Sequence, residues 1–436
     1  MILNFFLLLV TLYISLRAFP KKTFRFISVF CGPIVRLYLL KRISAGLEDK
    51  NRVKERFGIP SEKRPDGKLI WIHAVSVGET LSVIPVIEEM KKENSDLTIL
   101  LTTTTLTSYK QVEQRLKDKV IHQFIPFDIF MWIRRFIKYW KPSAAFFVES
   151  ELWPNILYYL HEKDIPTYLL NVRISNRSLK RMYFVKKYLN ILPFSLFTTV
   201  YVPSIELKNA VKDLGSKDTQ IVPNMKTISK KLPVNSENFK KLSKKISDRK
   251  AWLAVSTHPG EEDIVIDAHK KLKKIYPNIL TIIAIRHPTR KDEVADLCKA
   301  SNLTSLSYAD SFNTSKNLTE DIYILDKIGC LGEFFETIDS VLVCGSLVPG
   351  IGGHNFLEPL NFTCNVATGE YIENFRDIYP YVEKYCKVLK NSSEISDFVS
   401  DSIEHFSKNS NIMKELNFWE QWKKIIKQLS RSIFRS

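Results

Sequence analysis

The sequence predicts an α/β protein in which two facing Rossmann-like domains follow an N-terminal membrane anchor. Three observations support this: an uncharged apolar N-terminus, short apolar runs that alternate with helical spacing, and a lysine-rich stretch that interrupts the alternation. The 436 residues are enough for two domains with cores of their own. We expect the anchor over residues 1–40, an N-terminal domain over 41–235 and a C-terminal domain over 236–436.

The first element is the apolar N-terminus, MILNFFLLLVTLYISL, which carries no charge before Arg17 and is followed by basic residues within 17–25. A run of about 16 apolar residues is at the short end for crossing a bilayer, so a shallow or tilted anchor fits as well as a full span. Basic residues on the C-terminal side of the run predict that the rest of the chain is cytoplasmic. A signal peptide would carry its charges before the run, which this sequence does not.

A second apolar stretch, residues 26–40, is interrupted by Gly32, Pro33 and Arg36. We expect it to lie at the membrane interface or to pack on the protein, and not to span. The net charge of +17 predicts an anionic partner, either nucleic acid or an anionic membrane surface. The apolar N-terminus favours the membrane surface, and we expect no nucleic-acid partner.

The N-terminal half then alternates predicted strands and helices. Six runs of β-branched and aromatic residues are separated by stretches with helical spacing, which is typical of a parallel, doubly wound sheet. The predicted strands are KLIWIHAV, LTILLTTTT, VIHQFIP, AAFFVES, PTYLLNV and FTTVYVPS. The lysine-rich segment 226–250 ends the alternation, so we place the domain junction within it.

The C-terminal half repeats the pattern. Its predicted strands are AWLAVSTHPG, ILTIIAIRHP, IYILDKIG, SVLVCGSL and NVATG. Two halves of similar size, neither with a GxGxxG motif, predict two facing domains with a cleft between them. Ligands of such sheets bind outside the carboxyl ends of the strands, and polar residues follow strands in both halves.

Carboxylates follow two strands of the first half. Glu79 comes after the first strand and a glycine, where a carboxylate either stabilises a helix start or acts as a general base. A helix start would also favour the ionised form that a base needs. Glu149 and Glu151 follow the fourth strand directly, ahead of Trp153 and Pro154. Because a structural role would require a buried partner for each carboxylate, we favour a functional role for the pair.

Hydroxyl and basic side chains follow two strands of the second half. In STHPGEED and AIRHPTR, the side chains of Ser256, Thr257 and Arg286 accompany backbone N–H groups at predicted helix starts. This combination predicts an anion site suited to a phosphate. The pairing of His258 and His287 at adjacent strand ends adds to that prediction.

The string GSLVPGIGGHNFLEP, residues 345–359, predicts a ligand loop followed by a helix. Its glycines allow the backbone to approach a ligand closely. The helix would open near His354, with Asn355 and Glu358 on one face because they are three residues apart. A carboxylate at that position can accept hydrogen bonds from both hydroxyls of a ribose.

The sequence lacks the spacings of common metal and nucleophile motifs. There is no HExxH, DxD or CxxC, which favours a reaction without a metal, and no GxSxG elbow for a nucleophilic serine. The six cysteines lie mostly in apolar surroundings, so we expect free thiols in a reducing compartment.

Together, the motifs WIHAVSVGE, FVESELWPN, VRISNRS, STHPGEE, RHPTR and GSLVPGIGGHNFLEP, in this order, resemble the 3-deoxy-D-manno-octulosonic acid (Kdo) transferases of lipopolysaccharide assembly. The resemblance implies a GT-B-like fold with an acceptor domain followed by a nucleotide-sugar donor domain. It implies an inverting, metal-independent glycosyltransferase that moves Kdo from CMP-Kdo to a lipid A precursor. The enzyme would work at the cytoplasmic face of the inner membrane, with no cofactor besides this donor.

The same resemblance implies roles for single residues. Glu79 would accept the proton of the acceptor hydroxyl, Glu149 would stabilise the transition state, and Lys226 of PNMK would share that second role. The positions that match CMP-binding residues of the family are Arg286, His287, Ile328, Gly329, Cys330, Asn355, Phe356, Leu357 and Glu358. This chain reads DKIGCLGEFF where the family has DTMGEL, so a contact at 328–330 would be made mostly through the backbone.

Two other functions stay open at this point. One is a different GT-B enzyme that uses a UDP-sugar, either a transferase or an epimerase, and a comparison of CMP with UMP binding separates it. The other is a non-catalytic, membrane-tethered binding module, which would have no need for paired carboxylates at strand ends.

Overall fold

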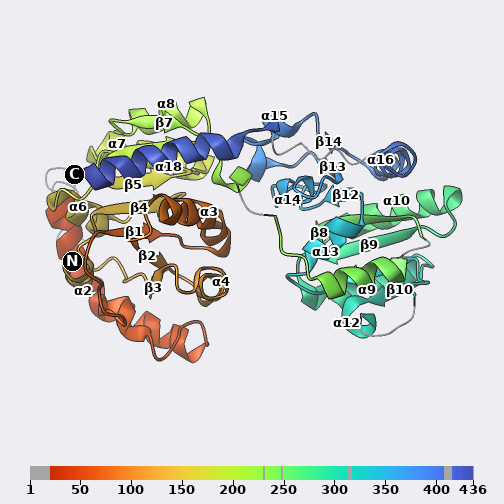
Figure 1. Cartoon of the computed structure of the whole chain (residues 1–436), viewed down its shortest axis with the longest axis horizontal. Helices are drawn as coiled ribbons and strands as arrows, with labels where there is room; N and C mark the ends of the chain where they lie inside the picture. The colour runs from red at the N-terminus through yellow and green to blue at the C-terminus, as the bar shows by residue number, and fades with distance from the viewer. Residues whose placement is uncertain (1–19, 229–230, 247–248, 313–316, 407–414, 436) are drawn as a thin grey trace, which may run out of the picture. The chain divides into compact units, whose positions relative to one another are not determined.

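The computed structural model describes residues 20–228, 231–246, 249–312, 317–406 and 415–435. The chain divides into two compact units (Figure 1). Unit 1 comprises Met1–Ser229 and Trp419–Ser436, and unit 2 comprises Lys230–Phe418. Each unit contains one seven-stranded sheet in which all the pairings are parallel.

The sheet of unit 1 has the strand order β3-β2-β1-β4-β5-β6-β7. Its strands are β1 (Leu69–His73), β2 (Thr98–Thr103), β3 (Ile121–Phe124), β4 (Ala144–Val148), β5 (Thr167–Leu170), β6 (Thr199–Val202) and β7 (Thr219–Ile221). Every residue of β1 and β4 is buried, as expected for central strands of a parallel sheet that is covered on both faces. Because the chain order reverses between β1 and β4, the topological switch point lies there.

The helices of unit 1 are α2 (Pro20–Ser44), η1 (Val53–Phe57), α3 (Val77–Glu93), α4 (Leu106–Leu116), α5 (Phe130–Trp140), α6 (Pro154–Glu162), α7 (Asn176–Leu189), α8 (Ile205–Asp213), η2 (Met225–Ile228) and α18 (Phe418–Arg435). Helices such as α3 and α5 bury apolar side chains in the core of unit 1. In the core, the Trp71 ring packs edge-on against Phe136 of α5 and Phe147 of β4, with centroids 4.9 and 5.3 Å away.

The sheet of unit 2 has the order β10-β11-β9-β8-β12-β13-β14. Its strands are β8 (Ala251–Thr257), β9 (Leu280–Ile285), β10 (Ser305–Ser307), β11 (Ile322–Leu325), β12 (Ser340–Val343), β13 (Asn365–Thr368) and β14 (Cys386–Val388). The switch point lies between β8 and β12, which pair with each other in the middle of the sheet.

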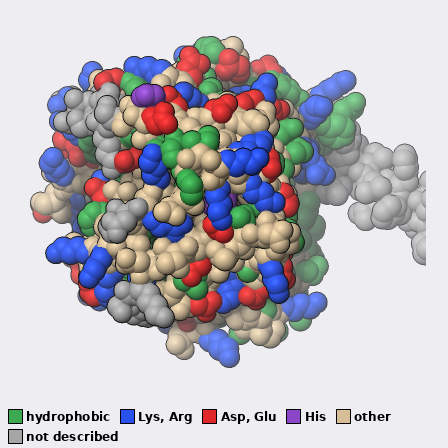
Figure 2. All heavy atoms as spheres, turned by 90° about the vertical axis from the view of Figure 1, so that its right-hand side faces the viewer, with side chains coloured by type: hydrophobic (Ala, Val, Ile, Leu, Met, Phe, Trp, Pro, Cys, Tyr) green, Lys and Arg blue, Asp and Glu red, His purple; other side chains and the backbone are tan. Residues whose placement is uncertain are grey.

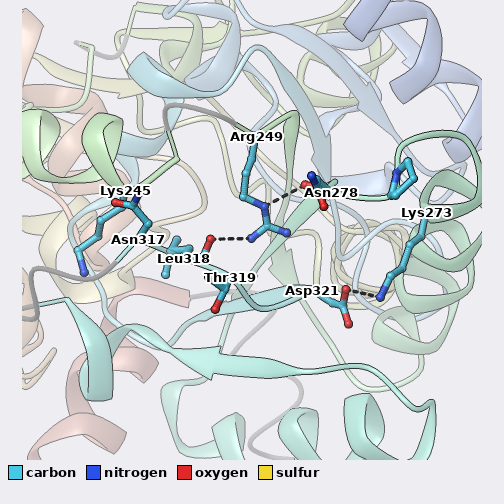
Figure 3. A pocket seen from close by; sticks show the side chains of 9 residues that line it. Lys245, Arg249, Lys273, Asn278, Asn317, Leu318, Thr319 and Asp321 are labelled. Carbon is cyan, nitrogen blue, oxygen red and sulfur yellow. Dashed lines mark hydrogen bonds and ion pairs between the residues drawn. The ribbon is translucent and has the colours of Figure 1, made fainter.

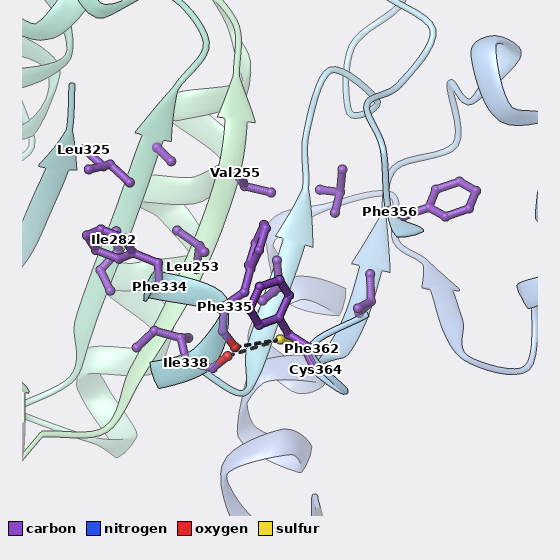
Figure 4. Close-up of a cluster of buried hydrophobic side chains, with 14 of the residues drawn as sticks. Leu253, Val255, Ile282, Leu325, Phe334, Phe335, Ile338, Phe356, Phe362 and Cys364 are labelled. Atoms are coloured by element: carbon purple, nitrogen blue, oxygen red, sulfur yellow. Dashed lines mark hydrogen bonds between the residues drawn. The ribbon is translucent and has the colours of Figure 1, made fainter. Parts of the chain in front are cut away.

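Helices α9 (Ser236–Ile246) and α13 (Leu331–Thr337) pack together over one face of that sheet. The cluster beneath them joins strand residues such as Leu253 and Ile282 to Phe334 and Phe335 of α13 (Figure 4). The remaining helices of unit 2 are α10 (Glu261–Ile275), η3 (Pro288–Arg290), α11 (Lys291–Ala300), α12 (Tyr308–Ser311), α14 (Leu357–Leu360), η4 (Glu373–Phe375), α15 (Tyr379–Val382) and α16 (Ser392–His405).

The prediction of two Rossmann-like domains is confirmed, and each of the eleven predicted strands is present. The sequence interpretation missed β7, β10 and β14, which are three-residue strands toward the edges of the sheets. Such strands are too short to show a period-2 pattern.

The sequence interpretation assigned residues 236–436 to one C-terminal domain, whereas the structure places the last helix in unit 1. Helix α18 is part of unit 1, apart from its first residue. Its Trp422 is fully buried, and the indole N–H of Trp422 donates a hydrogen bond of 2.8 Å to the carbonyl oxygen of Pro223. The chain therefore returns to unit 1 after unit 2 is complete, because α18 has an apolar face that the surface of unit 1 covers.

The apolar N-terminus that predicted an anchor, residues 1–16, lies outside the described residues. The interrupted stretch 26–40 forms part of one continuous helix, α2, with Pro33 inside it. Among the described helices, α2 is the one that has the length and composition to cross a membrane.

Candidate functional site

Glu79 lies in the first turn of α3, directly after the carboxyl end of β1. Ser76 is the N-cap of α3, and its hydroxyl oxygen accepts the Glu79 N–H at 3.3 Å. In return, the Glu79 carboxylate accepts the Ser76 O–H at 3.0 Å and the Val75 N–H at 2.7 Å. The segment therefore resembles a capping box of the S-x-x-E type, except that Glu79 accepts the N–H of Val75, one residue before the N-cap, so Glu79 does stabilise the helix start.

The same carboxylate is strongly shielded from water. Glu79 is 8% exposed, and burial raises its pKa to about 7, with smaller contributions in the same direction from the negative charges of Glu149 and Glu151. The hydrogen bonds from Val75 and Ser76 oppose this shift without cancelling it. The expectation that the helix start keeps Glu79 ionised is therefore wrong, because burial outweighs the helix-start effect.

Glu149 follows β4, the strand next to β1 at the switch point. Its φ of +63° places it in the left-handed region, which is uncommon for a residue with a side chain. Its N–H donates to Leu170 O at 2.9 Å, so sheet pairing with β5 continues into this residue. Backbone strain of this kind is often found at functional sites, where the surrounding structure maintains it.

Glu151 completes the carboxylate cluster and makes contacts that the sequence did not reveal. Its carboxylate accepts the indole N–H of Trp153, and burial raises its pKa. The Nε2 atom of His73 lies 3.8 Å from Glu151 Oε2. His73 is fully buried, and burial lowers its pKa to about 3, so its ring is neutral at physiological pH.

His73 is a site candidate that sequence reasoning missed. The Nδ1 atom of its ring lies 2.9 Å from the Thr102 hydroxyl, while its Nε2 atom has no hydrogen-bond partner among the residues that the structure describes. Buried polar atoms usually have a partner, so an unpaired ring nitrogen facing a carboxylate cluster indicates room for a ligand or water. Its only signal in the sequence was a histidine inside the apolar run WIHAV.

Lys226 belongs to the short helix η2, which packs against α3. Its backbone N–H donates to Asn224 Oδ1 at 3.0 Å, and the neighbouring Met225 N–H donates to Asn171 Oδ1 at 2.9 Å. These two amide contacts fix the backbone of η2. The structure thus places Lys226 on an element that contacts the helix of Glu79, within unit 1.

In unit 2, β8 ends in an irregular turn that carries Ser256 and Thr257. The register against β9 shifts between Val255 and Thr257, and Ser256 has a φ of +61°. The Thr257 hydroxyl is buried and has no hydrogen-bond partner among the described residues. This bulge interrupts the pairing of β8 with β9 near the carboxyl end of β8, and bulges of this kind are often found next to active sites.

Glu261, which sequence reasoning did not select, organises the loop that follows β12. One of its oxygens accepts the N–H groups of Ser346 and Leu347, each at 2.9 Å. The other accepts the N–H of Gly345 at 2.8 Å and that of His258 at 2.9 Å. Glu261 is completely buried; burial raises its pKa and the four N–H donors oppose that rise.

This arrangement changes the predicted anion site. Three consecutive N–H groups make a concave site that suits an anion, and here the Glu261 carboxylate already fills it. A phosphate therefore needs other donors in unit 2. The exposed side chain of Arg286 is one, because it has no hydrogen-bond or ion-pair partner among the residues described.

Three histidines gather beside Arg286. The Nε2 atoms of His258 and His354 are 2.8 Å apart, and their ring planes differ by 6°. The His287 ring stands edge-on to His258, with centroids 5.7 Å apart. Burial, together with the charges of His287 and Arg286, lowers the pKa of His258. The predicted grouping of His258 and His287 is thus present in the structure, and His354 joins it.

The glycine-rich loop requires its glycines. Gly345 has a φ of +72°, and a Cβ atom there would lie 2.5 Å from the His354 ring. Asn355 and Glu358 face each other as predicted, with the Asn355 amide donating to Glu358 Oε1 at 3.1 Å. The helix predicted to open near His354 is present as α14, but it begins at Leu357 and has only four residues.

The other predicted nucleotide-binding positions differ in what they can offer a ligand. The side chains of Phe356, Leu357 and Cys330 lie in the hydrophobic core of unit 2, so these residues could contact a ligand only through their backbone. Ile328 is 74% exposed, and Gly329 has a φ of +91° in a turn beside it.

A separate cavity of about 470 Å³ lies near the amino ends of the strands in unit 2 (Figure 3). Arg249 donates hydrogen bonds there to the carbonyl oxygens of Asn278 and Leu318, and Lys273 pairs with Asp321. These contacts hold loops together at the edge opposite to the histidines and Arg286. Within the described ranges, no group of three or more His, Cys, Asp or Glu residues could hold a metal ion.

The excess positive charge is not gathered into one area on the face shown in Figure 2. Lys and Arg side chains are interspersed there with Asp and Glu. On that face, the mixed charge forms no extended basic groove of the kind that binds nucleic acid.

Comparisons with known proteins agree with this architecture. A family model described as "3-Deoxy-D-manno-octulosonic-acid transferase (kdotransferase)" matches residues 51–229. A probable mitochondrial 3-deoxy-D-manno-octulosonic acid transferase of Arabidopsis thaliana is 33% identical over 371 residues, which cover 83% of this chain and 82% of the relative. The 3-deoxy-D-manno-octulosonic acid transferase of Rickettsia bellii is 31% identical over 412 residues, covering 90% of this chain and 97% of the relative.

A solved structure shows the same fold. The UDP-GlcNAc 2-epimerase from Neisseria meningitidis superposes with a TM-score of 0.56 over 83% of this chain and 99% of the epimerase, at 14% identity. At that identity the likeness shows a GT-B-like fold and no shared activity. The extent and identity of the matches to named transferases decide the family: the chain belongs to the Kdo transferases, which are glycosyltransferases.

Proposed function

We propose that this enzyme transfers Kdo from CMP-Kdo to a lipid A precursor in one inverting displacement that needs no metal ion. The observation that carries the proposal is the Glu79 carboxylate, which is shielded from water, lies at the switch point of unit 1 and has its pKa raised to about 7. A general base works best when its pKa lies near the operating pH. Membership of the Kdo transferases indicates which sugar is transferred, and the position and raised pKa of Glu79 indicate how the acceptor is activated.

Glu79 removes the proton from the acceptor hydroxyl as that oxygen attacks the anomeric carbon of Kdo. The Val75 N–H and the Ser76 hydroxyl hold the carboxylate in one orientation. A positioned base of this type accelerates transfer by roughly 10² to 10⁴. Because burial disfavours the charged carboxylate, proton uptake by Glu79 is energetically favoured.

Glu149 and Lys226 act on the charges that develop in the displacement. The sugar becomes cationic as the bond to the leaving group lengthens, and the nearby Glu149 carboxylate stabilises that charge. Lys226 offers a positive charge to the anionic groups of the donor. Support for both roles comes from their placement after β4 and on η2, in the same unit as Glu79.

The donor binds at the switch point of unit 2. Arg286, an exposed guanidinium without a protein partner in the described part of the chain, neutralises the phosphate that leaves with CMP. His287 and the Thr257 hydroxyl lie at the same strand ends and complete this site with Ser256. Glu358, together with the backbone of 328–330 and 355–357, contacts the nucleoside.

The reaction takes place at the cytoplasmic face of the inner membrane, where the acceptor's phosphates and the anionic leaflet attract the basic chain. The basic residues that follow the apolar N-terminus support this orientation. The donor base is tested by titrating the enzyme with CMP and UMP, and tighter binding of UMP would overturn the assignment of CMP-Kdo.

The assignment of Glu79 is tested with Glu79→Gln, and Glu93→Gln on the same helix is the matched control. Glu93 is exposed and pairs with Lys427 at 3.4 Å. The products formed from CMP-Kdo and a tetraacyl lipid A precursor are weighed by mass spectrometry, and the new anomeric linkage is read by NMR. We expect Glu79→Gln to bind CMP and to lose transfer by at least a hundredfold, whereas Glu93→Gln keeps it. Retained transfer in Glu79→Gln would refute the role of Glu79.

A further inference from the structure

Helix α2 is fastened to unit 1 along one face. Ser28 and Leu39 of this helix are buried, at 8% and 2% exposure, and they lie on one stripe because they are eleven residues apart. Helix α2 contacts both α5 and α6. The Ser28 hydroxyl also accepts the N–H of Phe130, the first residue of α5, at 3.2 Å.

Both ends of α2 are held by charged contacts with the same unit. Near the N-terminal end, Arg25 donates to the Glu162 carboxylate at the end of α6, at 3.2 Å through its first amino group. Near the C-terminal end, Arg42 Nε donates to Glu48 Oε1 at 2.7 Å. Glu48 in turn accepts three hydrogen bonds from Arg56, at 2.9, 3.0 and 3.2 Å, and both of these residues are buried.

The opposite face of α2 is apolar, and no other described part of the chain covers it. Five large side chains on it are between 61% and 67% exposed: Phe26, Phe30, Ile34, Leu37 and Leu40. Their spacing of four, four, three and three residues places them on one side of the helix. Lys22 and Lys41 lie on the same side at its two ends. An apolar stripe with a lysine at each end suits the boundary between acyl chains and anionic headgroups.

We propose that α2 lies flat in the membrane interface, with this stripe in the bilayer and its other face docked on unit 1, and that it does not cross the membrane. Length and composition alone would allow a crossing. However, Arg25 and Arg42 are about 26 Å apart along a helix, and a crossing would put them on opposite sides of about 30 Å of hydrocarbon. One folded unit in water cannot hold both ends in that case.

The docked helix would fix the carboxylate cluster at a set distance from the bilayer. Helix α6 begins three residues after Glu151 and ends at Glu162, which receives Arg25 of α2. A helix of nine residues is about 13 Å long. This inference concerns membrane contact and does not depend on the proposed transfer reaction.

Loss of membrane binding is a poor test, because the apolar residues 1–16 could hold the chain at a bilayer without α2. The depth of α2 is the sharper measurement. Single cysteines replace Phe26, Ile34 or Leu40 in the full chain, with Cys31→Ser as background because the other five cysteines are buried. Each new cysteine carries an environment-sensitive fluorophore. Vesicles of phosphatidylethanolamine and phosphatidylglycerol contain lipids with a nitroxide at a shallow or a deep carbon.

We expect equal quenching at all three positions, at least twofold stronger with the shallow nitroxide than with the deep one. Ile275→Cys is the matched control, an apolar residue of α10 that is 58% exposed, and it should stay unquenched. Deep quenching at Ile34 with shallow quenching at both ends would show a crossing helix and overturn the proposal. Equal quenching of the control would show general adsorption to the vesicles. Self-quenching without lipid quenching would show that a second copy of the chain covers the stripe. Either result also overturns the proposal.

Discussion

The substitution Glu79→Gln separates the two roles of this residue, helix cap and base, because they predict opposite effects on stability. The capping box gives Glu79 a stabilising role at the start of α3. Burial gives the charged carboxylate a destabilising one, since its pKa rises from 4.5 to about 7. Gln keeps the size of the side chain and removes its charge.

The activity of the unaltered enzyme should follow the ionised fraction of Glu79. With a pKa of about 7, that fraction is about 9% at pH 6 and about 91% at pH 8. The value of kcat/KM at low acceptor concentration should therefore rise about tenfold between these pH values. A carboxylate with an ordinary pKa would be ionised throughout, and the profile would be flat over the same range.

The sign of the stability effect follows from linkage. A carboxyl whose folded pKa is raised contributes stability below its unfolded pKa, near 4.5, and this contribution is lost as the pH rises through about 7. At pH 8 the loss is about 3 kcal/mol. Gln carries no charge and so avoids this loss of stability. However, Gln cannot accept hydrogen bonds from both the Val75 N–H and the Ser76 hydroxyl, which costs about 1 kcal/mol of stability.

The difference in stability between Glu79→Gln and the unaltered protein is measured by calorimetric unfolding at pH 5 and pH 8. Glu93→Gln is the control. We expect Glu79→Gln to unfold at a higher temperature than the unaltered protein at pH 8, and at an equal or lower temperature at pH 5. The control should show no such dependence on pH. If Glu79→Gln is the less stable protein at pH 8, the capping role dominates and the argument for a buried base fails.

Three further outcomes are expected. Glu261→Gln should raise the KM for CMP-Kdo more than it lowers kcat, because Gln cannot accept all four N–H groups that Glu261 holds. The control is Glu293→Gln, which changes an exposed residue. Equal kinetics for the two variants would contradict this prediction. Arg286→Ala should weaken CMP binding by about 1.5–3 kcal/mol, measured by calorimetric titration, and unchanged affinity would remove Arg286 from the donor site. Trp422→Ala should destabilise unit 1 by about 3–5 kcal/mol in denaturant unfolding while CMP affinity is kept, and an unchanged midpoint would show that α18 does not stabilise unit 1.

Sequence reasoning selected Glu79 and Glu149 as candidates because each follows a run whose composition marks a strand, and both strands are buried. It missed Glu261, although that residue stands inside a motif it had selected. A carboxylate at a helix start looks the same whether it caps its own helix or reaches another loop. The role of Glu261 depends on β12 lying beside β8, and that pairing joins residues more than eighty positions apart.

Burial explains the other differences. Phe356 and Leu357 stand in a motif that matches nucleotide-binding residues, yet their side chains fill the core of unit 2. Spacing places neighbouring residues on one element but does not say which of them turns inward. The same limit applies to His73, whose buried ring lies 3.8 Å from a carboxylate that comes 78 residues later in the chain.

By itself, the sequence determined the two parallel sheets, the strand ends that carry the polar residues, and the family, because these depend on local patterns and on motif order. Only the tertiary structure decided the raised pKa of Glu79, the use of the 345–347 amides by Glu261, the return of α18 to unit 1 and the docking of α2. Each of these depends on which distant elements exclude water from a given group. Desolvation and long-range contact are properties of the packed chain, and no periodicity along the sequence records them.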